Sequence, residues 1–242
     1  KGSRLHAYRG FHLFLKENRL EWMMAHVYPD NALIETTMAE IPKGKWVHLM
    51  VTYDGSSSTK GSKIFINGQE AKTEVTIDNL YKDIVFHKLR DIIYNGAVEP
   101  NLQIGARWRG KGLKGVLVDE ILVYDRELSP IEVLTIAKPE GWKEFIAAPS
   151  TSLSSDQEHL LKAHYLNNIS PAYQAEKKHL HDLRTALVDS MEYVKEIMVL
   201  KEMETPRKSF VLNRGVYDDY GEPVSPNTPA SVMKMPDTLP KN

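Results

Sequence analysis

The hydrophobic pattern of the chain changes its period near residue 155. Between residues 11 and 125, short apolar segments alternate with turn residues, whereas after residue 155 apolar side chains recur every three or four positions. A period near two is typical of strands, and a period near 3.6 is typical of helices. A doubly wound α/β fold needs helical patterns between its strands, and none appears before Ser129. The pattern predicts a mainly β domain followed by helices.

The first half of the chain predicts about eight short strands with turn signals between them. They are expected at residues 11–15, 20–28, 31–37, 46–53, 62–66, 71–77, 102–106 and 116–124. Asn67-Gly68 is the strongest hairpin signal, because both residues tolerate a positive φ, and it precedes the expected return strand at 71–77. Many short strands of this kind favour a β-sandwich. Trp22 and Trp46 fall on expected strands and are predicted to lie in the core.

The second half predicts two helices. Residues 160–169 suit the first helix, with Ser155 or Asp156 as its N-cap. Seven apolar residues on one stripe predict a second helix from about Pro171 to Met203: Leu180, Leu183, Leu187, Met191, Val194, Ile197 and Met198. The short turn between the helices suggests an antiparallel hairpin. The stripe is longer than the packing of two helices against each other requires. We therefore expect it to cover an outer face of the strand at 116–124.

These patterns divide the chain into four parts. Residues 1–135 form the predicted sandwich, 136–154 a connector, 155–204 a helical hairpin, and 205–242 an extended tail. The Ser/Thr-rich run at 149–155 is the expected linker within this order. The tail carries six prolines, and such a segment seldom builds a core of its own. We interpret it as the start of a further domain.

The charge balance and the residue usage exclude several classes of function. With 31 basic and 32 acidic residues, the formal net charge is −1, which argues against nucleic acid as a partner. The chain has no cysteine, so disulfides, thiolate zinc sites and cysteine nucleophiles are excluded within it. It contains no run of about 18 apolar residues, so no membrane span is predicted.

Three pieces of the first half resemble the laminin-G-like, or concanavalin A-like, lectin modules of bacterial exported proteins. The pieces are WVHLMVTYDG at 46–55, KIFING at 63–68, and LQIG at 102–105 followed by GVLVDEILVYDRELS at 115–129. The resemblance covers residues 11–134 and implies a two-sheet antiparallel jelly roll.

The tail carries a second resemblance. EMETPR at 202–207, FVLNRGVYD at 210–218 and GEPVSP at 221–226 are similar to the start of a C-terminal domain of unknown function in large exported proteins of planctomycetes and Bacteroidetes. This resemblance implies that the chain is a piece of a larger exported protein, periplasmic or at the cell surface. Other domains of the same polypeptide are then the expected partners.

The carboxylates do not match a glycosidase. A glucanase on such a sandwich needs acidic residues two and four apart on one strand face, about 5–5.5 Å across for a retaining mechanism. Asp119 and Glu120 are adjacent and therefore point to opposite faces, and the positions two and four further on are apolar or Tyr124. The helix histidines lack the spacing of a metal pair and are expected in solvent or on the helix surface. We expect no catalytic residue in this chain.

Two groups of residues remain as ligand candidates. Trp108 can stack on a sugar ring, and its neighbours Arg107 and Arg109 can pair with carboxylate or sulfate oxygens of a glycan. The alternative is that Trp108 packs against the helical half. In similar modules the aspartate at the position of Asp119 helps to bind a structural calcium ion, so calcium is the one cofactor considered. The alternative for Asp119 is that it accepts hydrogen bonds from backbone amides.

Three functions therefore compete. The first is a carbohydrate-binding, lectin-like module without catalysis of its own. The second is a non-binding scaffold domain in a multidomain exported protein, and the third is a glycoside hydrolase. A pair of facing carboxylates, one of them with a raised pKa, would favour the third.

Overall fold

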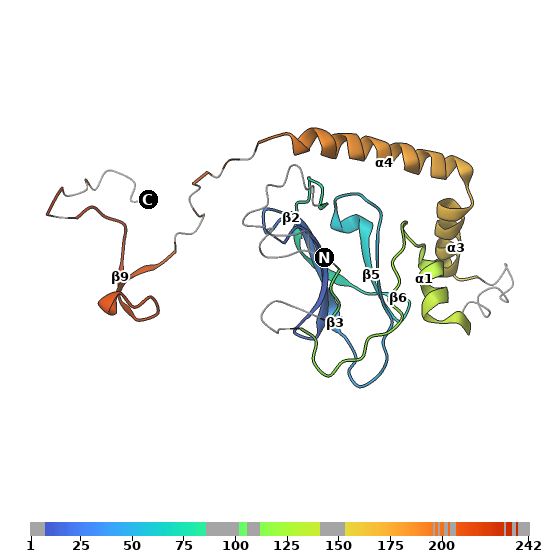
Figure 1. Ribbon diagram of the computed structural model, residues 1–242, viewed down its shortest axis with the longest axis horizontal. Helices are drawn as coiled ribbons and strands as arrows, with labels where there is room; N and C mark the ends of the chain where they lie inside the picture. Colours follow the sequence, from blue (N-terminus) through green and yellow to red (C-terminus); the bar gives the residue numbers. More distant parts are fainter. Residues whose placement is uncertain are drawn as a thin grey trace. The chain divides into compact units, whose positions relative to one another are not determined.

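The computed structural model describes residues 8–85, 102–105, 112–140, 153–195, 197, 199–200, 203, 207–229, 231–233 and 236. The chain separates into two compact units, residues 1–194 and 195–242 (Figure 1), and each is described by itself.

A four-stranded antiparallel sheet forms the first layer of unit 1. Its strands are β1 (Gly10–Lys16), β2 (Arg19–Val27), β3 (Asn31–Glu40) and β7 (Thr73–Asp78), in the order β1-β2-β3-β7. The strands predicted at 11–15, 20–28 and 31–37 are therefore confirmed. Antiparallel pairing of neighbours in sequence explains this agreement, since each strand can be recognised from its own alternation and turns.

A three-stranded antiparallel sheet forms the second layer. It contains β4 (Leu49–Tyr53), β5 (Ser62–Ile66) and β6 (Gln69–Glu70), with the short 3₁₀ helix η2 (Thr59–Gly61) before β5. Asn67 and Gly68 have φ values of 51° and 80°, so the predicted hairpin turn is confirmed.

The predicted return strand at 71–77 has a different partner. Only the two residues of β6 pair with β5, and the chain then crosses to the first sheet, where β7 pairs with β3. The amide of Met38 donates to the carbonyl of Lys72 at 2.8 Å and marks this crossing. A turn signal specifies where the chain reverses, but the length of the ladder that follows depends on long-range pairing.

The core lies between the two sheets and beneath a helix. One cluster joins Leu20 and Ile41 to Ile64 of β5, and Trp22 packs against it. A second cluster contains Met24, Leu33 and Leu80, and Trp22 also contacts this one. Trp22 is therefore the side chain that connects the two clusters, in agreement with its predicted core position.

Other predicted strands are absent or shorter. Residues 102–105 and 116–124 form no strand, and Ala106 lies outside the described residues. Glu120 has a φ of 50°, which interrupts the extended backbone in the middle of 116–124. The strand predicted at 46–53 begins only at Leu49, and Trp46 ahead of it is 67% exposed, so its predicted core position is wrong.

A helix that the sequence pattern did not predict follows the sandwich. This helix, α1 (Pro130–Ala137), begins with a reciprocal capping box between Ser129 and Glu132 and has proline at its first turn. Its buried Val133 packs with Leu128 and with Phe65 of β5. The spacing Ser-Pro-Ile-Glu at 129–132 is the local signal that could have revealed it.

The two predicted helices are present with different ends and a different arrangement. They are α3 (Ser155–Asn168), capped by Ser154 rather than Ser155 or Asp156, and α4 (Pro171–Glu192), which ends before the predicted Met203. Figure 1 shows α4 leading away from the end of α3 instead of returning alongside it. The two helices therefore do not form the antiparallel hairpin that was predicted. The side chains of Leu180, Leu183 and Leu187 are 46%, 55% and 62% exposed.

The predicted cover of residues 116–124 by this leucine stripe is therefore wrong. α4 instead turns polar side chains toward the sandwich. Lys177 Nζ lies 2.7 Å from Glu127 Oε2, and Arg184 Nη1 donates to the carbonyl of Asp54 at 3.5 Å. The leucines lie beside these contacts on the helix surface, so they stay exposed.

Unit 2 contains one described hairpin. It is formed by β8 (Ser209–Leu212), the 3₁₀ turn η6 (Asn213–Gly215) and β9 (Tyr220–Val224). The rings of Phe210 and Tyr220 lie 5.1 Å apart across it.

In the described part of the chain, no helix is long and apolar enough to span a bilayer.

Candidate functional site

The predicted glycan contacts fall between two described segments, residues 102–105 and 112–140. Arg107, Trp108 and Arg109 themselves lie outside the described residues. On either side of them, the amide of Leu113 donates to the carbonyl of Gly105 at 2.9 Å, and Gly105 has a φ of 69°. This bond brings the backbone of residues 105 and 113 together.

Asp119 is described and exposed. Its Oδ1 accepts a hydrogen bond from the amide of Glu120 at 2.8 Å, which is the backbone contact considered as the alternative to calcium. Among the described residues, no three histidine, aspartate or glutamate side chains gather as metal ligands would. Calcium at Asp119 stays a prediction.

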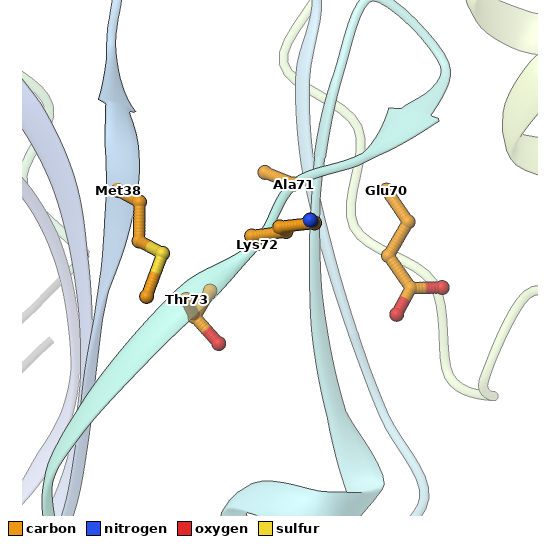
Figure 2. A pocket seen from close by; sticks show the side chains of 5 residues that line it. All are labelled: Met38, Glu70, Ala71, Lys72 and Thr73. Carbon is orange, nitrogen blue, oxygen red and sulfur yellow. The ribbon is translucent and has the colours of Figure 1, made fainter.

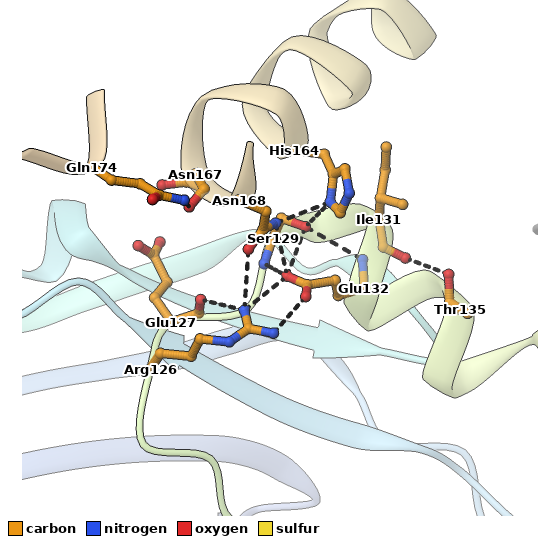
Figure 3. Close-up of polar contacts among 10 residues, drawn as sticks. All are labelled: Arg126, Glu127, Ser129, Ile131, Glu132, Thr135, His164, Asn167, Asn168 and Gln174. Atoms are coloured by element: carbon orange, nitrogen blue, oxygen red, sulfur yellow. Dashed lines mark hydrogen bonds and ion pairs between the residues drawn. The ribbon is translucent and has the colours of Figure 1, made fainter. Parts of the chain in front are cut away.

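A polar network joins the start of α1 to the end of α3 (Figure 3). Arg126 Nη2 lies 2.6 Å from Glu132 Oε1, and Glu132 Oε2 accepts from the amide of Ser129 at 2.8 Å. His164 Nδ1 on α3 lies 2.9 Å from Ser129 Oγ and 3.0 Å from Asn168 Nδ2. His164 is half-buried on α3 and has protein partners there.

This network is not arranged for nucleophilic catalysis. In a catalytic triad the carboxylate orients the histidine, whereas Glu132 here contacts Ser129 and Arg126. Ser129 is 2% exposed, so a substrate does not reach its hydroxyl. Burial by itself would raise the pKa of Glu132, but hydrogen bonds from Arg126 and Ser129 outweigh it and lower the pKa to about 2. The network holds α1 and α3 together.

A buried carboxyl group lies between the sheets. Glu35 on β3 is 2% exposed, and its Oε1 accepts a hydrogen bond from Ser62 Oγ on β5 at 2.5 Å. Burial raises the pKa of Glu35, and the negative charges of Asp78 and Glu70 raise it further, against hydrogen bonds from Ser62 and Thr73. The sequence pattern gave no sign of this group, because an acidic residue on a strand usually faces solvent.

Asp78 is the carboxylate whose charge raises the pKa of Glu35 most, but its oxygens are bonded elsewhere. Its oxygens accept from the amide of Thr59 at 2.8 Å, from Thr59 Oγ1 at 2.9 Å and from Ser58 Oγ at 3.1 Å. A glycosidase needs two carboxyl groups that reach a sugar from both sides of its bond. Glu35 is enclosed, and Asp78 accepts hydrogen bonds at the start of η2. The hydrogen bonds of these two side chains therefore connect the layers of the sandwich.

An open hollow lies where the chain crosses between the sheets (Figure 2). Its volume is about 430 Å³, and Met38, Glu70, Ala71, Lys72 and Thr73 line it. Figure 2 shows Met38 and Glu70 on opposite sides of the crossing backbone, with Ala71, Lys72 and Thr73 along it. Ligand sites have volumes of roughly 300–1,000 Å³ but bury most of their ligand, whereas this hollow is open to solvent.

Comparison with known proteins identifies the family of the sandwich. No match was found among curated proteins. The crystal structure of an S-layer domain-containing protein (residues 221–444) from Clostridium thermocellum ATCC 27405 is similar at 17% identity, with a TM-score of 0.27. That similarity covers 54% of this chain and 64% of the other, so the chain spans less than two thirds of that structure. The laminin-G-like family of the concanavalin A-like lectin/glucanases superfamily matches residues 2–134, more than half of the chain, and the protein belongs to this superfamily.

Proposed function

We propose that the chain is a carbohydrate-binding, lectin-like module of a larger exported protein and has no catalysis of its own. The observation that carries the proposal is membership of residues 2–134 in a superfamily of lectins and glucanases. Within that superfamily, the carboxylates distinguish the two activities. The buried Glu35 and the bonded Asp78 support the lectin alternative for the part of the chain that the structure describes.

The proposed site is the loop that carries Trp108. The bond between Gly105 and Leu113 supports it, because a loop with closed ends on a rigid sandwich is a usual place for binding groups. Arg107 and Arg109 favour an acidic or sulfated glycan, since a guanidinium pairs bidentately with carboxylate or sulfate oxygens. A calcium ion at Asp119 is part of the same proposal.

A glycan array followed by titration of two tryptophan variants tests this site. Trp108→Ala should lower the affinity for the bound glycan about thirtyfold. This corresponds to about 2 kcal/mol of binding free energy, which the burial of the aromatic ring provides. Trp46→Ala is the matched control, because Trp46 is an exposed tryptophan on the same sandwich. An equal loss of glycan affinity in both variants, or no loss of affinity in Trp108→Ala, would place the binding surface elsewhere.

The absence of catalysis is tested separately. The purified chain is incubated with a polysaccharide panel, and new reducing ends are measured. We expect no turnover. Turnover that disappears in Glu35→Gln or Asp78→Asn would favour the glycoside hydrolase.

A scaffold function is the second candidate, and exposed apolar side chains favour it. Leu183 and Leu187 of α4 are more than half exposed, and so are Leu117 and Val123 in the unpaired segment 116–124. Contiguous exposed apolar surface is typical of contact with other domains or proteins. If the chain binds nothing on a broad glycan array, the scaffold function takes precedence.

A further inference from the structure

His26 is enclosed where several segments of unit 1 meet. It lies on β2 and is 6% exposed. Its Nδ1 is 2.5 Å from the carbonyl oxygen of Asp83, in the segment that follows β7. Its Nε2 is 2.9 Å from Nη2 of Arg9, and Nε of the same arginine donates to the carbonyl of His26 at 3.2 Å.

These two contacts are compatible with one form of the imidazole. A carbonyl oxygen only accepts hydrogen bonds, so Nδ1 must carry the proton that it donates to Asp83. A guanidinium only donates, so Nε2 must be unprotonated to accept from Arg9. The geometry therefore requires a neutral ring with its hydrogen on Nδ1.

We propose that His26 is a proton-sensitive latch, which fastens the segment after β7 to β2 at neutral pH and releases it in acid. A second proton on Nε2 would point at the N–H groups of Arg9, and the two cations would repel each other. The bond to Arg9 would be lost, and the enclosed ring would carry a positive charge close to those of Arg9 and Lys82, with the negative charge of Glu192 opposing them.

The release would extend to the end of α4 through the residue beside Asp83. Lys82 is 6% exposed and donates from Nζ to the carbonyl of Val194 at 3.1 Å. Residues 82 and 83 thus contact β2 through the carbonyl of Asp83 and the residues after α4 through the side chain of Lys82. Opening at His26 loosens both attachments.

The burial of the ring and the charges around it favour release in acid. Burial lowers the pKa of His26 most strongly, and the positive charges of Arg9 and Lys82 lower it further. The hydrogen bond to Asp83 and the negative charge of Glu192 oppose them, and the pKa remains below its ordinary value of 6.5. The open form then binds a proton more readily than the closed form, so the closed form loses stability as the pH falls below 6.5.

Amide hydrogen exchange on the whole chain measures the opening. For residues 81–85 and 193–194, the opening constant, corrected for the intrinsic rate, should rise between pH 7.5 and 5.5, by at most about tenfold, because one histidine protonates in the open form. Amides of α1 provide the internal reference and should not follow this change, because the pKa of its Glu132 is about 2 and this group stays ionised over the whole range. A rise no larger at 81–85 than in α1 would overturn the latch.

A matched pair of variants assigns the effect to His26. His26→Gln keeps an acceptor for Arg9 but cannot take up a proton, so the rise should disappear. His159→Gln, at an exposed position on α3, should keep it. If His26→Gln does not fold, nitrogen chemical shifts of the wild-type ring decide instead. The Nδ1–H tautomer at pH 7.5 with protonation below pH 6.5 supports the latch, and protonation at or above 6.5 contradicts it.

Discussion

Ser62 of β5 donates a hydrogen bond to Glu35 of β3 and so joins the two sheets through their shared interior. Few carboxyl groups are as completely enclosed as Glu35, which is 2% exposed. Because its pKa is raised, the protonated group is the form that the interior favours. The ionised form weakens the fold at neutral pH.

Glu35→Gln should therefore stabilise the chain at pH 7. The amide keeps an acceptor for Ser62 and cannot ionise, so a gain of about 1 kcal/mol is expected. In the wild type, protonated Glu35 stabilises the fold. This stabilisation is fully present below pH 4.5 and is lost as the pH rises through the raised pKa of Glu35. Urea unfolding at pH 4 and pH 7 measures it. A variant that is less stable than the wild type at both pH values would contradict the expectation.

Ser62→Ala should act in the opposite direction. It removes a hydrogen bond that lowers the pKa of Glu35 and leaves a buried carboxylate with fewer donors. A loss of about 1–3 kcal/mol at pH 7 is expected, and it should be smaller at pH 4. In the double variant with Glu35→Gln, the dependence of this loss on pH should disappear.

Glu132→Gln should give the reverse pH profile. The pKa of Glu132 is lowered to about 2, so its contribution is present above the ordinary 4.5 and is lost as the pH falls toward 2. Because the ion pair with Arg126 is partly exposed, the loss at pH 7 should be about 1 kcal/mol. Asp182→Asn in the exposed pair with Lys178 is the control and should leave the unfolding midpoint unchanged. Thermal unfolding between pH 3 and pH 7 compares the two.

Gly61→Ala should destabilise the loop before β5. A Cβ at this position would lie 1.9 Å from Asp54 Oδ1 and 2.2 Å from Ser56 Oγ, and Asp54 Oδ1 is held by the amide of Ser56 at 2.8 Å. A loss of about 1–3 kcal/mol is expected. Adding Asp54→Ala should recover part of it. Gly44→Ala meets nothing within 4 Å, so any strain that it causes should not respond to Asp54→Ala.

Leu183→Ser should change stability little, by less than about 0.5 kcal/mol, because this side chain of α4 is 55% exposed. Leu33→Ala, at a fully buried position of β3, should cost about 2–5 kcal/mol. Chemical unfolding of both variants compares them. A large loss in Leu183→Ser would mean that the leucine stripe is covered in solution.

Local signals were the predictable part of the fold. The turn at Asn67 and Gly68 and the start of α4 at Pro171 depend on the conformational preferences of one or two residues. The start of α1 was equally local, since Ser129 and Glu132 have the spacing of a capping box. It was missed because the apolar residues around it continue the strand-like pattern.

Long-range relationships were not predictable in this way. The partner of β7, the enclosure of Glu35 and the contact of His26 with Asp83 each join residues distant in sequence. Apolar alternation at 116–124 indicates a strand, but a ladder also needs a partner edge, and a positive φ at Glu120 prevents regular pairing. The predicted ligand residues around Trp108 lie outside the described residues, so that site stays a prediction.

The crossing between the sheets has a consequence for the order of folding. Thr37 of β3 pairs with Thr73 of β7, and the whole second sheet lies in the chain between them. Closing a long flexible loop costs more entropy than closing one that a hairpin has already shortened. The β4–β5–β6 meander, with its tight Asn67-Gly68 turn, should therefore form first and bring Thr73 toward β3. Mutations in that turn should slow refolding, whereas mutations in β7 should mainly speed unfolding.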